Sequence, residues 1–592
     1  MCGIVGYIGN KKAKDVLLTG LKNLEYRGYD SSGIALIDES SVKKIKSVGK
    51  IVNLEEKLDK ENLNNYTVGI AHTRWATHGE ANIKNAHPHT VGKVTIVHNG
   101  IIENADSLRS ELIKEGVNFS SETDTEVVAA LLNKYIENDF IKTINKVQSI
   151  LKGSYALGII LEDNPDKLYA VKKDSPLVIG VGNNENFFAS DITAINTYTN
   201  KFIFLDEGEI ALVTKKDIKV YKNLNILEKK VDTIDVEVSS KSKNGYKHYM
   251  LKEINEEPVV LENTLKKYLD DFDTVPDLSK YEEIHIVACG SAMYAGMVGK
   301  YLLEEYADIK TIVEVASEYR YKKNIYNVKT LVILVSQSGE TADTIAALRK
   351  AKEEGQDTLA VVNVKTSTIA READKAVFIE AGEEISVATT KAYILQASIF
   401  SLLSLKLAFV KGNITDIDKY IKDFRKLPMI IKNVIDKEKS YKEIAKKIYD
   451  KEDVFFLGRK IDYAICLEGS LKLKEVSYIH SEAYQAGELK HGTISLITKD
   501  MPVIGIITDS DIADKTISNL IETASRGAKC ILVATDQLKQ NFENEIIVPT
   551  VNKFLQPLVV VPALQLIAYY TALLRNCDID KPRNLAKSVT VE

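Results

Sequence analysis

The chain opens with MCGIVGYIGN, residues 1–10, and the organisation of its first half follows from this stretch. Residues 3–8 are an apolar run of strand length, which predicts a buried strand that holds the amino end inside a domain. Once the initiator methionine is removed, Cys2 carries a thiol beside a free α-amine, whose pKa of roughly 7.7–8.0 lets it accept a proton near neutral pH. We therefore expect a nucleophilic cysteine; the alternative is a small residue near an unstructured end.

Composition limits the class of protein. The 592 residues predict about three or four domains, and 45% hydrophobic with 27% charged residues is typical of soluble globular proteins. The net charge is −5, and acidic and basic residues are interspersed along the chain, so nothing indicates a nucleic-acid-binding surface. Five scattered cysteines without a CxxC pair favour a reducing compartment, and no leader pattern is present, so we expect a cytoplasmic protein. The apolar stretch 554–574 contains prolines and glutamines, which predicts a buried helix and no membrane partner.

Residues 1–238 are predicted to form one domain of short strands with a few helices. Helical spacing covers residues 15–24 and 125–135, and strand patterns cover 66–71, 94–98 and 155–161. The polar segment 239–245 has no apolar anchors, which predicts a linker over residues 239–247.

Beyond the linker, apolar runs alternate with helical patterns, which indicates βαβ units around parallel sheets. The runs 283–288 and 331–335 are repeated as 453–457 and 503–507, each followed by a turn and a helix. We expect two homologous α/β lobes, residues 248–430 and 431–582, and a polar tail, residues 583–592, that forms a lid or is disordered.

Polar side chains in the first half are suited to binding a small zwitterion. The side chain of Asn99 and the backbone N–H of Gly100 could stabilise an oxyanion. Arg74 and Asp124 could hold a substrate carboxylate and amine. Each has an ordinary alternative: a hairpin turn for Asn99-Gly100, a surface ion pair for Arg74 and a helix N-cap for Asp124. The histidines at 87 and 89 have no partners at ligand spacing, so no metal is expected.

In the second half, the run 331–335 ends in Ser336-Gln337-Ser338-Gly339-Glu340-Thr341 before a helix. Hydroxyls and N–H groups at a helix N-terminus make a phosphate cradle, and plain helix capping is the alternative. No lysine follows at Walker spacing, so no nucleoside triphosphate is expected. Ser291, after the preceding strand, could reach the same ligand.

A charged helix follows at residues 467–475, LEGSLKLKE. Glu468, Lys472 and Glu475 fall on one helical face, so a cleft could hold a base beside a cation. The alternative is a solvated charge ladder.

Six motifs occur in a fixed order along the first half: MCGIVGYIG, EYRGYDSSG, HTRWATHG, NAHPH, HNGIIEN and SETDTEV. They resemble the N-terminal-nucleophile glutaminase domain, and with the distal half the chain resembles the glutamine–fructose-6-phosphate aminotransferase (isomerizing) family over essentially its whole length. The resemblance implies an αββα glutaminase domain followed by two sugar-isomerase lobes. It also implies synthesis of glucosamine 6-phosphate from L-glutamine and D-fructose 6-phosphate, in hexosamine biosynthesis, without a cofactor.

The resemblance implies roles for residues of the first half. Cys2 would be the nucleophile, and Asn99 and Gly100 the oxyanion hole. Trp75 would gate an ammonia channel, with an ordinary packing aromatic as the alternative. Glutamine would be bound by Arg74, Thr77 and Asp124, with His87 lining or ordering the site.

For the second half it implies that Glu475 moves a proton between C1 and C2, with Lys472 as its electrostatic partner and Glu468 as a supporting carboxylate. His491, from the neighbouring subunit of a homodimer, would open the ring, and Lys587 would form a Schiff base. The sugar phosphate would contact Ser291, Ser336, Gln337, Ser338, Thr341, Val387 and Thr389. Ala292 and Thr389 depart from the family pattern, which puts one sugar contact in doubt.

Two other functions fit parts of the pattern. A different glutamine amidotransferase, such as one that uses phosphoribosyl pyrophosphate, would share the first half but would need a pyrophosphate-binding loop. A non-catalytic phosphosugar sensor would share the lobes but has no use for Cys2, Glu475, His491 and Lys587 together.

Overall fold

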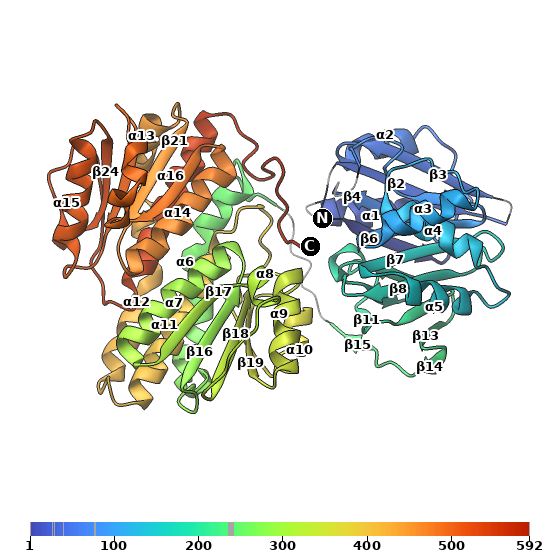
Figure 1. Cartoon of the computed structure of the whole chain (residues 1–592), viewed down its shortest axis with the longest axis horizontal. Helices are drawn as coiled ribbons and strands as arrows, with labels where there is room; N and C mark the ends of the chain where they lie inside the picture. Colours follow the sequence, from blue (N-terminus) through green and yellow to red (C-terminus); the bar gives the residue numbers. More distant parts are fainter. Residues whose placement is uncertain are drawn as a thin grey trace. The chain divides into compact units, whose positions relative to one another are not determined.

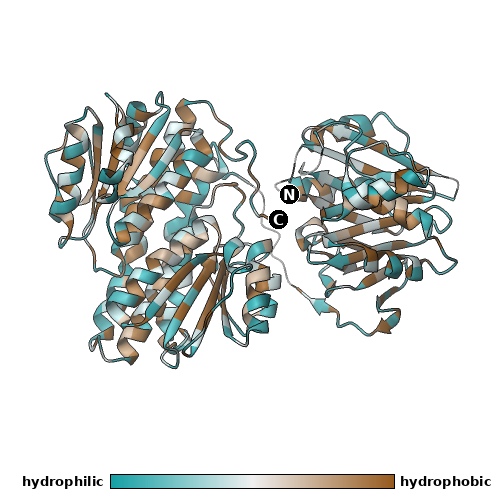
Figure 2. Cartoon of the chain, in the orientation of Figure 1, coloured by the Kyte–Doolittle hydropathy of each residue, from teal (hydrophilic) through white to brown (hydrophobic). Residues whose placement is uncertain are grey.

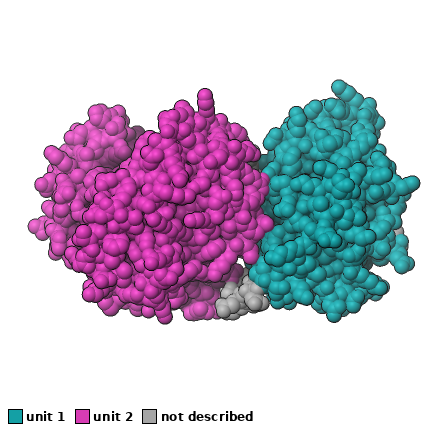
Figure 3. Space-filling view, turned by 90° about the horizontal axis from the view of Figure 1, so that it is seen from below, with its two compact units in different colours: residues 1–240, 588–592 teal, residues 241–587 magenta. Residues whose placement is uncertain are grey.

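The computed structural model describes residues 2–25, 28, 30–39, 41–75, 79–234 and 242–590. The chain divides into two compact units, residues 1–240 with 588–592 and residues 241–587 (Figures 1 and 3). Thr77 and part of the expected linker, residues 239–241, lie outside the described residues.

Unit 1 contains two antiparallel sheets. The eight-stranded sheet has the order β15 (Asp232–Thr233), β11 (Lys201–Phe204), β9 (Val178–Val181), β10 (Asn186–Ala189), β1 (Gly3–Ile8), β4 (Val68–Arg74), β2 (Ser31–Ile37) and β3 (Val42–Val48). The seven-stranded sheet has the order β14 (Asn225–Leu227), β13 (Ile218–Lys222), β12 (Ile210–Val213), β8 (Leu168–Lys173), β7 (Gly153–Leu161), β6 (Val94–Ile102) and β5 (His89–Val91). The predicted amino-terminal strand is therefore β1, near the middle of its sheet.

Helices cover the outer face of each sheet in unit 1. α1 (Ala13–Leu24) and α2 (Ile51–Leu58) share an apolar cluster with the eight-stranded sheet. The seven-stranded sheet shares another cluster with α3 (Ala105–Lys114), α4 (Asp124–Lys134) and α5 (Phe140–Ile150). A third cluster, which includes Ile4 and Val97, joins the two sheets face to face. The order of layers is αββα, as expected.

Unit 2 contains two five-stranded parallel sheets of the same topology (Figure 1). The first has the order β17 (Lys310–Val315), β16 (Glu283–Ala288), β18 (Thr330–Ser336), β19 (Asp357–Val362) and β20 (Lys375–Phe378). The second has the order β22 (His480–Gln485), β21 (Asp453–Gly458), β23 (Pro502–Ile507), β24 (Lys529–Thr535) and β25 (Glu545–Val548). The strands predicted to be repeated, β16 with β21 and β18 with β23, take equivalent places, which confirms two α/β lobes.

Helices bury both faces of these sheets. Along β18, Ile333 faces one apolar cluster and Leu334 the other, as period-two alternation requires. Because both faces of each sheet are buried, hydrophobic residues point to both sides of the strands, and much of these strands is brown in Figure 2. The remaining helices of unit 2 are α6 (Tyr249–Asp270), α7 (Gly290–Ala307), α8 (Ala316–Tyr319), α9 (Ala342–Glu353), α10 (Thr368–Glu372), α11 (Lys391–Val410), α12 (Ile417–Ile435), α13 (Glu438–Ile448), α14 (Ile461–Ser477), α15 (Ala513–Ala524) and α16 (Gln556–Leu574).

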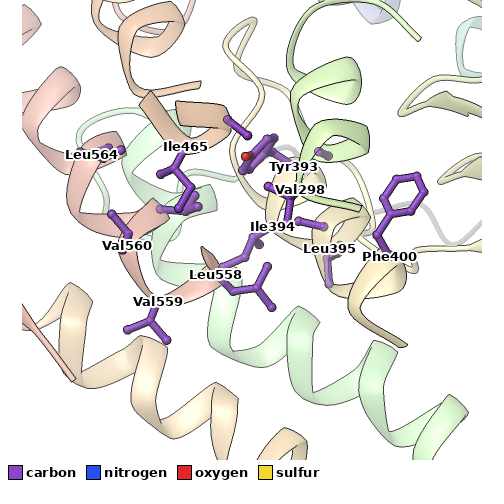
Figure 4. Packing of buried hydrophobic residues seen from close by; sticks show 14 of the residues in the cluster. Val298, Tyr393, Ile394, Leu395, Phe400, Ile465, Leu558, Val559, Val560 and Leu564 are labelled. Atoms are coloured by element: carbon purple, nitrogen blue, oxygen red, sulfur yellow. The ribbon is translucent and has the colours of Figure 1, made fainter. Parts of the chain in front are cut away.

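The largest apolar cluster joins the two lobes through their long helices. Figure 4 shows Val298 of α7, Leu395 of α11, Ile465 of α14 and Val560 of α16 within it. Among the described residues, α11 and α16 are long and apolar enough to cross a membrane, but 89% of each apolar window is buried inside the protein. The expectation of a buried helix in the stretch 554–574 is therefore correct.

Candidate active sites

Cys2 lies at the start of β1, next to the end of β4. Strand pairing puts Gly3 opposite Thr73, and the backbone N–H of Trp75 donates to the sulfur of Cys2 at 3.3 Å. The thiol lies 3.5 Å from the carbonyl oxygen of Trp75. Burial raises the pKa of the Cys2 thiol. The resting sulfur is therefore a protonated thiol that must lose its proton to a base before it can attack.

Asn99 and Gly100 lie inside β6, so the hairpin-turn alternative is wrong. The amide nitrogen of Asn99 donates to the carbonyl oxygen of Cys2 at 3.1 Å. Gly100 has a φ of +123°, and an added Cβ would lie 2.0 Å from the carbonyl oxygen of Ser154. Only glycine fits there. The strand thus presents a side-chain donor and a glycine backbone together at the cysteine.

His72 on β4 orients the amide of Asn99. Its Nε2 lies 2.9 Å from the carbonyl oxygen of His98 and 3.1 Å from Oδ1 of Asn99. A carbonyl oxygen only accepts hydrogen bonds, so Nε2 must carry the proton and Oδ1 of Asn99 must accept it. Burial lowers the pKa of His72 to about 3, so the ring stays neutral. Sequence reasoning missed this residue, although it shares a face of β4 with Arg74, two positions along.

The other predicted glutamine contacts surround the same pocket. Arg74 is buried and donates to the backbone oxygens of Gly79 and Glu80, at 3.2 and 3.3 Å, so it is not a surface ion pair. The carboxylate of Asp124 accepts the backbone N–H of Ile102 at 2.9 Å and does not cap its own helix. The pocket is lined by Cys2, Arg74, Trp75, His87, His98, Gly100, Thr123, Asp124 and Thr125.

His87 belongs to a buried histidine network behind the pocket. The backbone N–H of His98 donates to Nδ1 of His87 at 3.3 Å, so the proton of this ring is on Nε2, 3.2 Å from Oγ1 of Thr125. The ring stacks on His72 with centroids 4.0 Å apart, and burial lowers its pKa well below the usual value. Within the described ranges no group of three ligands could hold a metal ion.

In unit 2 the hydroxyl-rich turn joins β18 to α9. The backbone N–H of Gly339 donates to Oγ of Ser336 at 3.0 Å, and the hydroxyls of Ser336 and Thr341 lie 2.9 Å apart. Gly339 has a φ of +67°, which lets the turn curl back on itself. Gln337 and Ser338 occupy the tip, and Thr341 is the N-cap residue of α9. The turn therefore presents hydroxyls at a helix N-terminus, as a phosphate cradle requires.

The other predicted sugar contacts come from two further segments of the first lobe. β16 and β18 are parallel neighbours, with Ala288 opposite Val335, so Ser291 at the start of α7 lies at the same sheet edge as the turn. Val387 and Thr389 lie between β20 and α11, and Ala292 follows Ser291 in α7.

The charged face of α14 is buried, so the solvated-ladder alternative is wrong. Lys472 is 1% exposed; its Nζ lies 2.6 Å from Oε2 of Glu475 and 3.5 Å from Oε1 of Glu468. Burial raises the pKa of Glu468 to about 7, against the effect of Lys472. Burial alone would lower the pKa of Lys472, but the two carboxylates raise it overall. Lys472 is therefore a permanent cation between two carboxyl groups.

Lys587 is paired with a residue that sequence reasoning missed. Its Nζ lies 2.5 Å from Oε2 of Glu384, and the two side chains are 4% and 0% exposed. No local pattern marks Glu384, because 203 residues separate it from Lys587. Its closeness to Val387 and Thr389 in the sequence is the one signal that could have drawn attention to it.

His491 is not brought to this cluster within the chain. It ends the short 3₁₀ helix η4 (Glu488–His491), and its side chain is exposed. Its role across subunits stays a prediction.

Comparison with known proteins agrees with both halves. Residues 72–197 match the glutamine amidotransferase domain, and residues 277–406 and 447–575 each match the SIS domain. A solved C-terminal domain of glucosamine-fructose-6-phosphate aminotransferase from Francisella tularensis is similar over 58% of this chain and 100% of that chain, at 39% identity and a TM-score of 0.55.

Full-length relatives are similar over 100% of both chains. They include glutamine--fructose-6-phosphate aminotransferases [isomerizing] of Caldanaerobacter subterraneus and Clostridium tetani, both 46% identical. The chain belongs to the glutamine–fructose-6-phosphate aminotransferase (isomerizing) family.

Proposed function

We propose that the chain transfers the amide nitrogen of L-glutamine to D-fructose 6-phosphate and isomerises the product to glucosamine 6-phosphate. The observation that carries this proposal is the presence of two chemically complementary sites in one polypeptide. One unit holds a cysteine beside an amide donor, and the other holds a buried lysine in a phosphosugar-type lobe.

In the glutaminase unit, Cys2 attacks the carboxamide carbon of glutamine and forms a γ-glutamyl thioester, which releases ammonia. The amide of Asn99 and the N–H of Gly100 stabilise the oxyanion. Arg74 binds the substrate carboxylate, and Asp124 binds its amine. Water then hydrolyses the thioester to glutamate. Thr77 completes the set of proposed glutamine contacts, and Trp75 is the proposed gate for the released ammonia.

In the isomerase unit, the turn at Ser336, Gln337, Ser338 and Thr341 binds the phosphate, and Ser291, Val387 and Thr389 contact the sugar. Lys587 forms a Schiff base with the open-chain ketose. Glu475 moves the proton between C1 and C2, and Lys472 holds that carboxylate in place at 2.6 Å. Glu468 balances the charge of Lys472 from the other side.

The assembly and location are part of the same proposal. The chain acts as a homodimer, in which His491 of one subunit opens the sugar ring in the other. It acts in the cytoplasm, where its five unpaired cysteines stay reduced.

The two half-reactions test the function directly. Purified protein is assayed for glutamate release from glutamine and for aminosugar from fructose 6-phosphate. We expect both activities. Glutamate release without any aminosugar would indicate a different glutamine amidotransferase. The absence of both activities would indicate a sugar-phosphate sensor.

A further inference from the structure

The contact between Lys587 and Glu384 is a buried ion pair at the proposed Schiff-base position. The amine lies 2.5 Å from Oε2 of Glu384, and water is nearly excluded from both side chains. Burying a carboxylate without a partner is costly, and the charge of Lys587 lowers the pKa of Glu384, which favours its ionised form. A Schiff base forms only from the neutral amine, so the reaction needs a group that takes the proton of Lys587 at the right moment.

The backbone fixes Glu384 so that one oxygen faces the lysine. Its Oε1 accepts the N–H groups of Thr390 at 3.0 Å and Ala392 at 3.2 Å, at the amino end of α11. Oε2 is left for Lys587. The carboxylate therefore cannot turn away from the amine without losing two hydrogen bonds at a helix N-terminus.

The neighbouring carboxyl group is not suited to the same task. Glu253 of α6 accepts the N–H groups of Ile385 and Ser386 with Oε1, at 2.5 and 3.1 Å. Burial, followed by the charge of Glu384, raises the pKa of Glu253 to about 8, so near neutral pH it is a carboxylic acid. Burial alone would raise the pKa of Glu384 as well, but Lys587 lowers it overall. Glu384 is the carboxylate of the two.

We propose that Glu384 is the acid–base group of Schiff-base formation at Lys587, a role that rests on the proposed function. Glu384 takes one proton from the ammonium group, and the freed lone pair forms the N–C2 bond while the C=O electrons move to oxygen. A second proton passes from nitrogen to that oxygen and gives a carbinolamine. Glu384 then returns its proton to the hydroxyl, the C–O bond breaks, and water leaves as the nitrogen lone pair forms the iminium.

This sequence balances without another reactant. An ammonium and a ketone become a protonated iminium and water, and Glu384 begins and ends as a carboxylate. The same carboxylate then lies beside the iminium cation in place of the ammonium, so the buried charge keeps its partner throughout the step.

Trapping of the Schiff base tests the proposal. The full chain is mixed with fructose 6-phosphate and excess cyanoborohydride, and the reduced adduct on the Lys587 peptide is followed by mass spectrometry. We expect Glu384→Gln to slow adduct formation by about 10²-fold. Glu384→Asp should retain part of the rate, and formate should partly restore Glu384→Ala. The control Glu383→Gln alters the exposed neighbour of Glu384 and should trap at the wild-type rate.

Two further measurements separate proton transfer from structural damage. Glutamate release and glucosamine 6-phosphate binding, measured by calorimetry, should stay within about threefold of wild type in Glu384→Gln. Trapping at the wild-type rate in Glu384→Gln, or loss of sugar binding in that variant, would overturn the proposal. Absence of an adduct at Lys587 in the wild type would instead refute the Schiff-base role of Lys587.

Discussion

Nε2 of His72 lies 3.1 Å from Oδ1 of Asn99 and turns the amide nitrogen of Asn99 toward the backbone of Cys2. The orientation of this amide decides whether an oxyanion at Cys2 meets a donor or a repelling oxygen. The neutral, Nε2-protonated form of His72 therefore prepares the proposed oxyanion hole before glutamine binds.

Replacing His72 should impair the chemical step more than substrate binding. We expect His72→Leu to lower kcat for glutamate release by about 10²-fold, because the Asn99 donor loses its fixed orientation. KM for glutamine should change by less than about threefold. His72→Gln, which can still donate to Oδ1, should recover most of kcat. The alkylation rate of Cys2 by iodoacetamide serves as the control, and an unchanged kcat in His72→Leu would contradict the assigned role.

Removing the sulfur should separate the two activities. Cys2→Ala should release no glutamate from glutamine, because no thioester can form, while isomerisation of the sugar phosphate continues. Removal of Met1 in the wild type is first verified by mass spectrometry. Cys577→Ala, which changes a cysteine of unit 2, is the matched control and should retain both activities. Simultaneous loss of both in Cys2→Ala would argue against two separate sites.

Removing the amine should have the opposite effect. Lys587→Ala should leave glutamine hydrolysis measurable while conversion of fructose 6-phosphate stops, because no Schiff base can form. The exposed tail residue Arg583 provides the control substitution Arg583→Ala. If Lys587→Ala still produced glucosamine 6-phosphate, the proposed Schiff base at Lys587 would not be needed for sugar conversion.

The buried acid Glu253 gives a stability prediction with a definite sign. Burial raises its pKa from 4.5 to about 8, so between these values the folded chain binds a proton that the unfolded chain does not. Wild-type stability therefore falls as the pH rises through this window, by up to about 1.4 kcal/mol per pH unit. Glu253→Gln removes this dependence.

Thermal unfolding of the Glu253 variant checks the sign. The Tm of Glu253→Gln relative to wild type should rise between pH 6 and pH 8. The control Glu262→Gln changes an exposed residue on the same helix and should show a constant difference. A difference that is flat or falls with pH for Glu253→Gln would show that this carboxyl is ionised in the folded protein.

Local sequence signals predicted most of the fold, because its elements are strongly patterned. The apolar run at residues 3–8 is β1 to the residue, and the repeated runs became equivalent strands of two parallel sheets. The helix expected over 125–135 begins at Asp124, one residue earlier. Asn99-Gly100 has the composition of a turn but continues a strand, because pairing with β7 overrides the local preference.

The candidate sites were only partly predictable. Cys2, Asn99 and Asp124 stand in motifs, but no motif shows which residues lie beside them in the folded chain. His72 meets Asn99 through the packing of two sheets, and Glu384 meets Lys587 across 203 residues. The burial of Lys472 also depends on tertiary packing, which helical spacing alone does not reveal.

The most direct test of the central claim follows the nitrogen atom. Purified protein is incubated with fructose 6-phosphate and glutamine labelled with ¹⁵N at the amide, and the sugar product is analysed by mass spectrometry. The account predicts glucosamine 6-phosphate that carries ¹⁵N, together with an equal amount of glutamate, and no labelled product from Cys2→Ala. Glutamate formed without any labelled aminosugar would contradict it.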